Sequence, residues 1–207
     1  MPPIRFPMRG LYLITPDAGD IDALSTCLPD ILPFAACLQY RRKQTPAPLH
    51  ASEAMRLRAI CRATGTCFIV NDDPRLAREV DADGVHLGED DGDIAAARNL
   101  LGPDRAIGIS CYDDAARARA AAASGAGYVA FGAMFPSSTK PNARRVTPAL
   151  FAETTALGVP RVAIGGITPD NARIAVAAGA DLVAVIGGVF DAPDPVAAAR
   201  AIASAFD

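Results

Sequence analysis

The chain has 207 residues and a net charge of −3, and its isoelectric point of about 5.4 argues against nucleic acid as the main partner. Hydrophobic residues make up 51% of the chain, enough for a large core, yet no apolar run approaches the ~20 residues that a membrane-spanning helix needs. The five cysteines are scattered without a C-x-x-C pair, which argues against a zinc site or a disulfide framework. We therefore expect a soluble cytoplasmic protein that makes no membrane contact.

Short apolar segments alternate with helical segments along the chain. The expected strands are 11–14, 36–40, 68–70, 84–87, 106–110, 128–131, 161–164 and 182–186. The expected helices are 20–32, 48–65, one opened by Pro74, 94–101, one capped by Asp113 that reaches 124–125, 148–157, 169–179 and 195–206.

These eight strand-then-helix units indicate the fold. The strands are short and nearly all apolar, which is typical of parallel strands covered by helices. The connections are short, and no linker divides residues 1–207. We therefore predict a single-domain α/β fold, the (β/α)8 TIM barrel, with a doubly wound open sheet as the alternative.

Carboxylates follow two neighbouring strands, at the face where such barrels bind ligands. Asn71 and Asp72 come directly after the third strand, and Asp91 follows the fourth. Because parallel strands end at the same face, we expect these groups to lie together. Their oxygens suit Mg²⁺, which takes one or two carboxylates plus substrate phosphate oxygens. The alternative is that these residues, with Asp73 and Asp90, are only loop and helix-capping groups.

Gln39, Arg41 and Lys43 occupy alternating positions at the end of the second strand. Alternation in an extended segment places the three side chains on one side. Two inward cations are costly unless they meet an anion, so we favour anion binding by Arg41 and Lys43. The alternative is a solvated basic loop, and that is the role we expect for Arg42.

Further groups that suit phosphate follow the later strands. Ser110 ends the fifth strand, where its hydroxyl can donate to a phosphate or cap the next helix. Hydroxyls precede a lysine in the loop after the sixth strand, and glycine pairs follow the last two strands, where this barrel class frequently binds phosphate through backbone N–H groups. These residues are Ser137, Thr139, Lys140, Gly165, Gly166, Gly187 and Gly188.

Three residues that often carry chemistry are expected to be structural. His86 lies within the fourth strand, and we expect a core histidine satisfied by hydrogen bonds rather than a catalytic group. His50, at a helix start, is expected to be exposed. Cys111 has no histidine near it in the sequence, so we do not expect a nucleophile.

Two anion sites follow from these patterns. One would be a monophosphate site at the glycine pairs. The other would be a metal-assisted diphosphate site containing Arg41, Lys43, Asn71, Asp72, Asp91 and Lys140. Two phosphorylated substrates in one barrel suggest transfer of a group from a diphosphate to a phosphorylated acceptor.

The same residues, taken in order, resemble the thiamine-phosphate synthase family over nearly the whole chain. The marks of the resemblance are LYLIT at 11–15, Gln39/Arg41/Lys43, Asn71-Asp72, DGVHLG at 83–88 with Asp91, GIS at 108–110, Gly132, Phe135-Pro136, Thr139-Lys140 and IGGI at 164–167. The resemblance implies Mg²⁺ and the joining of 4-amino-2-methyl-5-hydroxymethylpyrimidine diphosphate to thiazole phosphate. The products would be thiamine phosphate and diphosphate, with CO2 when the thiazole is carboxylated. It also implies a dissociative mechanism, in which diphosphate leaves before the thiazole nitrogen attacks.

The resemblance further implies residue roles. Asp72 and Asp91 would hold Mg²⁺, and Gln39 would hold the pyrimidine. The catalytic groups on the leaving diphosphate would be Arg41, Lys43, Ser110 and Lys140, with Asn71 as a further ligand. The thiazole phosphate would bind Ser137, Thr139, Gly165, Gly166, Gly187 and Gly188. A homodimer is common in this family.

Two other functions match part of the pattern. A thiazole tautomerase-like paralogue would need no diphosphate site. A non-catalytic barrel that senses thiazole phosphate would lose its metal ligands. Because this chain keeps both the cations and the carboxylates, we favour the synthase.

Overall fold

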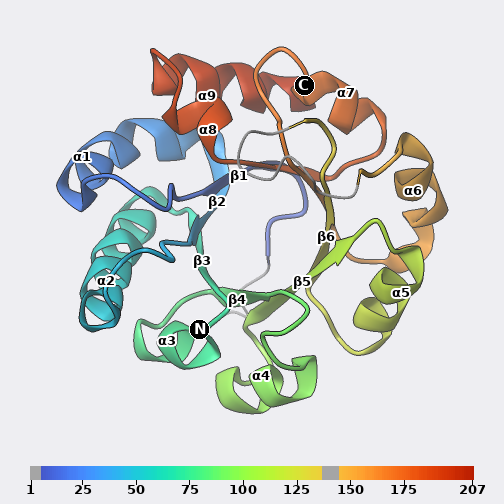
Figure 1. The fold of residues 1–207 in the computed structure, drawn as a ribbon, viewed down its shortest axis with the longest axis horizontal. Coiled ribbons are helices and arrows are strands. Elements are labelled where there is room, and N and C mark those ends of the chain that lie inside the picture. The colour runs from blue at the N-terminus through green and yellow to red at the C-terminus, as the bar shows by residue number, and fades with distance from the viewer. Residues whose placement is uncertain (1–5, 137–144) are drawn as a thin grey trace.

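A computed structural model describes residues 6–136 and 145–207, in which eight parallel strands close into a barrel inside a ring of helices (Figure 1). The strands are β1 Gly10–Ile14, β2 Ala35–Tyr40, β3 Cys67–Asn71, β4 Gly84–Leu87, β5 Ala106–Tyr112, β6 Tyr128–Gly132, β7 Arg161–Ile164 and β8 Leu182–Val185. The α-helices are α1 Ile21–Ile31, α2 Ala47–Thr64, α3 Pro74–Glu79, α4 Ile94–Leu101, α5 Ala115–Ala123, α6 Pro148–Glu153, α7 Ala172–Ala177, α8 Gly187–Phe190 and α9 Pro195–Ala203. Short 3-10 helices are η1 Leu32–Phe34, η2 Thr155–Leu157 and η3 Ser204–Phe206.

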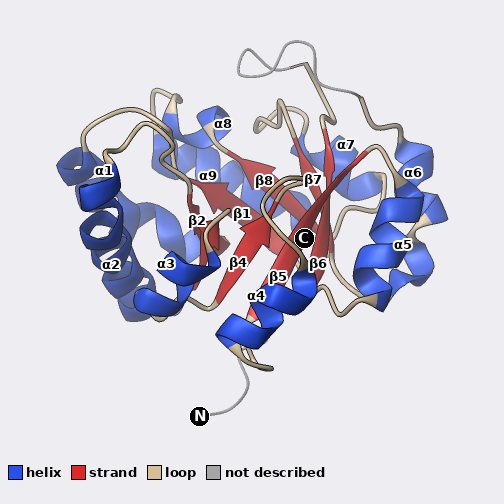
Figure 2. Ribbon diagram, turned by 60° about the horizontal axis from the view of Figure 1, so that its bottom comes forward, coloured by secondary structure: helices blue, strands red, loops and turns tan. Residues whose placement is uncertain are grey.

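Closure of the sheet decides between the two predicted architectures. Each strand pairs in parallel with the next in the sequence, and β8 pairs with β1 through partners that include Leu11 and Val183. An open sheet has two edge strands with one neighbour each, whereas every strand here has two neighbours. The (β/α)8 prediction is therefore confirmed, and all strands end at the same face of the barrel (Figure 2).

Strand alternation divides the core into two layers. In β1, Leu11 and Leu13 belong to the layer between the barrel and its helices, while Tyr12 and Ile14 belong to the layer inside the barrel. The inner layer also contains Phe6, which stacks on Tyr128 with ring centroids 3.9 Å apart. Side chains therefore fill the barrel interior, as is general for this architecture.

A buried ion pair ties α2 to the barrel below β4. Asp83 accepts from both terminal nitrogens of Arg58, at 3.1 and 3.0 Å, and from the backbone N–H of Phe68 at 2.7 Å. Burying these charges is tolerable because the carboxylate and the guanidinium satisfy one another. This contact lies at the amino end of the strands and links α2 to the barrel.

The structure corrects several predicted boundaries. The cap of α5 is Asp114 rather than Asp113, because the Asp114 carboxylate accepts from the N–H of Arg117 at 3.0 Å. β8 ends at Val185, and Gly187 begins the short helix α8 where a loop was expected. The predicted helix 169–179 is shortened to α7. Within the described ranges, no helix combines the length and hydrophobicity needed to cross a bilayer.

Candidate active site

A cavity of about 860 Å³ opens at the carboxyl ends of the strands. Every predicted site residue that the structure describes lines it: Gln39, Arg41, Lys43, Asn71, Asp72, Asp91, Ser110, Gly165, Gly166, Gly187 and Gly188. Ser137, Thr139 and Lys140 lie outside the described residues. The topology therefore brings together groups that are up to about 150 residues apart in sequence, because parallel strands deliver their ends to one face.

The cations of the cavity are held by acidic neighbours. Nη1 of Arg41 lies 2.6 Å from Oδ2 of Asp17, and Nζ of Lys43 lies 2.8 Å from Oδ2 of Asp72. Arg41 is mostly buried, whereas 55% of the Lys43 side chain is exposed. Asp17 was not among the predicted site residues, since its sequence TPD after β1 resembles an ordinary turn.

Two carboxylates face one another across the ends of β3 and β4. Asp72 has a left-handed backbone, with φ at 64°, and its N–H donates to the carbonyl of His86 at 2.8 Å. Oδ2 of Asp91 accepts from the N–H of Gly88 at 2.8 Å. Partial burial, and then the hydrogen bond with the Asp72 carboxyl, raise the pKa of Asp91. The negative charge of Asp72 raises it further, and a bound cation would relieve this repulsion.

The donor chemistry of this pair suits Mg²⁺ with an incomplete protein shell. Within the described residues, no group of three or more His, Cys, Asp or Glu side chains could hold a metal ion. Mg²⁺ usually binds through one or two carboxylates together with substrate phosphates and water. Asp72 and Asp91 therefore match a cation that arrives with a phosphorylated ligand.

A chain of neutral hydrogen bonds crosses the floor of the cavity. Nε2 of Gln39 donates to the hydroxyl of Tyr12 at 2.7 Å, and this hydroxyl lies 2.7 Å from that of Tyr128. The Tyr128 hydroxyl is 3.1 Å from Nδ1 of His86, whose Nε2 is 2.9 Å from Oγ of Ser110. Burial lowers the pKa of His86 to about 4, although the charge of Asp91 opposes the shift. The prediction of a buried, hydrogen-bonded His86 is confirmed.

The tyrosines of this floor were missed in the sequence because both belong to apolar strand segments. Only their alternation with inward-facing residues such as Ile14 could have indicated that Tyr12 points into the barrel. The contact between Tyr12 and Tyr128 joins residues 116 positions apart. No local pattern contains that information.

The opposite side of the cavity is built from glycines that admit no side chain. Gly165 and Gly166 have φ values of +104° and +64°. A Cβ at Gly166 would overlap the carbonyl oxygen of Pro136 and lie 2.8 Å from that of Phe135. A Cβ at Gly188 would overlap the carbonyl oxygen of Ile167. The packing of these turns therefore requires glycine at 166 and 188, and these two positions add no side chain to this wall of the cavity.

Asp191 is a cavity residue that the sequence did not reveal. It follows α8 and lines the cavity beside Gly187. Because α8 itself was not predicted, this carboxylate had no expected position.

Three further residues can be compared with the surroundings that the sequence predicted for them. Arg42, expected in a solvated loop, is 8% exposed and pairs with Glu53, so that prediction is wrong. His50, expected to be exposed, is half-buried with its ring edge-on to Tyr40, and its buried Nε2 has no hydrogen-bond partner among the described residues. Cys111 is buried, and burial raises the pKa of its thiol to about 12, which fits the expected structural role.

The fold and this cavity define a class, a TIM barrel whose carboxyl-end cavity is lined by cations, paired carboxylates and glycine turns. Comparison with known proteins points to one family within this class. The chain matches the family model of thiamine monophosphate synthase over residues 11–189. It is 59% identical over 198 residues to a thiamine-phosphate synthase of Xanthomonas campestris, with 96% of each chain covered, and 56% identical over 200 residues to that of Chromobacterium violaceum, with 96% and 97% covered.

A solved structure agrees with this match. The thiamine phosphate pyrophosphorylase from Pyrococcus furiosus superposes with a TM-score of 0.84 at 31% identity, covering 96% of this chain and 95% of that one. A 3-hexulose-6-phosphate synthase, at 18% identity and a TM-score of 0.71, shares the fold. The chain belongs to the thiamine monophosphate synthase family.

Proposed function

We propose that this chain joins 4-amino-2-methyl-5-hydroxymethylpyrimidine diphosphate to thiazole phosphate, and so produces thiamine phosphate and diphosphate. Membership of the family supports the reaction class. The observation that carries the proposal is one cavity with two unlike walls. One wall has cations and paired carboxylates, and the other has side-chain-free glycine turns.

The charged wall suits a diphosphate leaving group. Arg41 and Lys43 would bind its oxygens, and Asn71 and Ser110 would add hydrogen-bond donors. A Mg²⁺ ion held by Asp72 and Asp91 would supply further charge neutralisation for the diphosphate. Stabilising the charge that develops on a leaving group is usually the largest contribution to such a reaction.

A dissociative path needs no protein nucleophile. Diphosphate would leave first, and the ring amino group would stabilise the pyrimidinylmethyl cation. Gln39, held in place by Tyr12, would bind the pyrimidine on a floor that stays neutral, because the pKa of His86 lies near 4. Apolar lining residues such as Ile14 and Val162 would exclude water from the cation.

The glycine wall suits the phosphate of the acceptor. Gly165 and Gly166 after β7, and Gly187 and Gly188 after β8, would direct backbone N–H groups at that phosphate. This placement would bring the thiazole nitrogen toward the pyrimidine methylene, and the benefit would be that of proximity and orientation. The carboxylated thiazole would follow the same path and lose CO2.

A direct assay tests the proposal. The purified protein is mixed with both substrates and Mg²⁺, with and without EDTA, and thiamine phosphate is followed by thiochrome fluorescence. We expect product that disappears with EDTA. A folded protein that makes no product from either thiazole form would refute the synthase reaction and favour a tautomerase or a sensing role.

A further inference from the structure

Arg42 is a buried cation directed away from the cavity. In the sequence it stands between the two cavity-facing cations, Arg41 and Lys43, and only 8% of its side chain is exposed. Its Nε donates to Oε2 of Glu53 in α2 at 2.9 Å, and Glu53 is 11% exposed. A buried ion pair of this kind is weak support for stability, because desolvation offsets the attraction. The positions of the groups that this pair holds are therefore more informative about its role than its contribution to stability.

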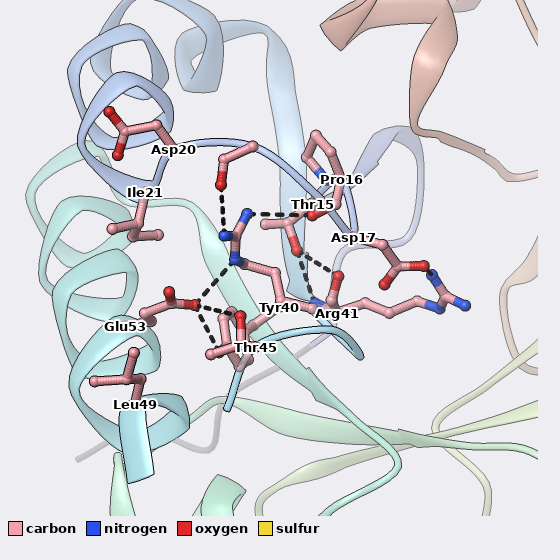
Figure 3. Close-up of polar contacts among 12 residues, drawn as sticks. Thr15, Pro16, Asp17, Asp20, Ile21, Tyr40, Arg41, Thr45, Leu49 and Glu53 are labelled. Carbon is pink, nitrogen blue, oxygen red and sulfur yellow. Dashed lines mark hydrogen bonds and ion pairs between the residues drawn. The ribbon is translucent and has the colours of Figure 1, made fainter. Parts of the chain in front are cut away.

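One carboxylate oxygen of Glu53 accepts three hydrogen bonds from the end of β2 and the β2–α2 connection. Besides Arg42, Oε2 of Glu53 accepts from the Tyr40 hydroxyl at 3.0 Å and from Oγ1 of Thr45 at 3.1 Å (Figure 3). Burial, and then the hydrogen bond to Glu53, raise the pKa of Tyr40, so it remains a donor. Tyr40 and Arg42, which alternate with Arg41, and Thr45 from the following turn thus anchor this connection on Glu53.

The same guanidinium holds the neighbouring β1–α1 connection. Nη2 of Arg42 donates to the carbonyl of Gly19 at 2.8 Å, and Nη1 to that of Pro16 at 3.4 Å. These carbonyls flank Asp17, whose Oδ2 accepts from Nη1 of Arg41 at 2.6 Å (Figure 3). Arg42 therefore fixes the segment whose carboxylate orients Arg41.

We propose that Arg42 and Glu53 form a positioning pair that sets the direction of the Arg41 guanidinium without touching substrate. The inference rests on the proposed function, in which Arg41 binds the diphosphate. The guanidinium reaches Glu53 and the two carbonyls with three different nitrogens, whereas a lysine carries all its donors on one. Loss of the pair frees the segment around Asp17 and lets Arg41 leave its direction toward the cavity.

The test measures diphosphate binding and turnover in Arg42→Met and Glu53→Gln. Calorimetry with inorganic diphosphate and Mg²⁺ gives Kd, and the thiochrome assay gives KM for each substrate. We expect Kd and the KM for the pyrimidine diphosphate to rise about tenfold, within the ~2–150-fold range of coupling inside one hydrogen-bonded network. The KM for thiazole phosphate stays at its wild-type value. Arg42→Lys keeps the charge, folds if Arg42→Met does not, and recovers part of the loss.

Arg58→Met is the matched control, since Arg58 of α2 forms a similarly buried ion pair with Asp83 at the amino end of the strands. It lowers the melting temperature and leaves both KM values unchanged. The second control is the Arg41→Ala background. If Arg42 acts through Arg41, adding Arg42→Met to Arg41→Ala changes kcat/KM by less than about twofold.

Three results would overturn the positioning role. They are wild-type diphosphate binding in Arg42→Met and Glu53→Gln, an equal loss in Arg58→Met, and a full tenfold loss added in the Arg41→Ala background. A wild-type protein that yields no thiamine phosphate would refute the proposed function instead. Binding of inorganic diphosphate still tests the positioning pair in that case.

Discussion

Replacement of Gly166 by alanine tests the glycine wall of the cavity. Gly166 follows β7 with φ at +64°, where a residue with a Cβ costs about 1–2 kcal/mol. Its Cβ would also overlap the carbonyl oxygen of Pro136 and approach that of Phe135. These are backbone atoms, so a rotamer change cannot relieve the overlap. Overpacking of this kind costs a further ~1–3 kcal/mol.

Gly158 separates the two contributions. It has a similar φ of +72°, no atom lies within 4 Å of the position its Cβ would take, and it does not line the cavity. Gly158→Ala should therefore lose only the free energy that a residue with a Cβ costs in the left-handed region. We expect Gly166→Ala to melt about 2–12 °C below Gly158→Ala, at ~2–4 °C per kcal/mol for a domain of this size.

Activity should separate the two variants further. A backbone shift of ~1 Å beside a bound phosphate lowers kcat/KM by about a hundredfold. We expect this loss for thiazole phosphate in Gly166→Ala and wild-type kinetics in Gly158→Ala, measured by thiamine phosphate formation. A Gly166→Ala variant with the melting temperature of Gly158→Ala and a wild-type KM would refute the close approach at this turn.

Three further predictions concern the carboxylates and the floor. Asp72→Asn keeps a residue that tolerates the left-handed backbone, and it should lower Mg²⁺-dependent turnover about a hundredfold. The control Asp73→Asn keeps the α3 cap and should keep full turnover. Equal rates in the two variants would refute the metal role of Asp72. The pKa of His86 is about 6.5 in the unfolded chain and about 4 in the folded protein. As the pH drops from 6.5 to 4, the free energy of unfolding should therefore fall ~3 kcal/mol more in wild type than in His86→Gln. Parallel curves of unfolding free energy against pH, measured in urea, would contradict the burial argument. Tyr128→Phe leaves the Tyr12 hydroxyl and Nδ1 of His86 with a lost partner and should cost ~1–3 kcal/mol, so an unchanged urea midpoint would show that these bonds contribute nothing.

Local patterns were sufficient for the framework of the fold. Short, mostly apolar runs of three to five residues located all eight strands, and the helix at 94–101 was predicted with the bounds of α4. The regular alternation of strand and helix then implied a parallel barrel. Because such strands all end at one face, the sequence also predicted that Gln39, Arg41, Asp72 and Asp91 would meet.

The errors arose where a local pattern fits more than one arrangement of the chain. Arg42 was expected in solvent because charge alone suggests solvation, yet Glu53 of α2 lies beside it and removes that need. Gly187 was expected in a loop because a glycine pair resembles a turn, although it begins α8. The cap of α5 moved by one residue, a difference set by which aspartate reaches the N–H of Arg117.

Periodicity, capping residues and strand ends are local properties of the chain, so they were enough to predict the eight units, their parallel order and the groups that gather after the strands. Which side chains hydrogen-bond to the same oxygen became visible only in the folded protein. The contacts of Glu53 with Tyr40 and Arg42, and of Tyr12 with Tyr128, depend on how separate elements pack against each other. Hydrogen bonds act over about 3 Å, so a residue's partner is fixed only when packing has set the distance.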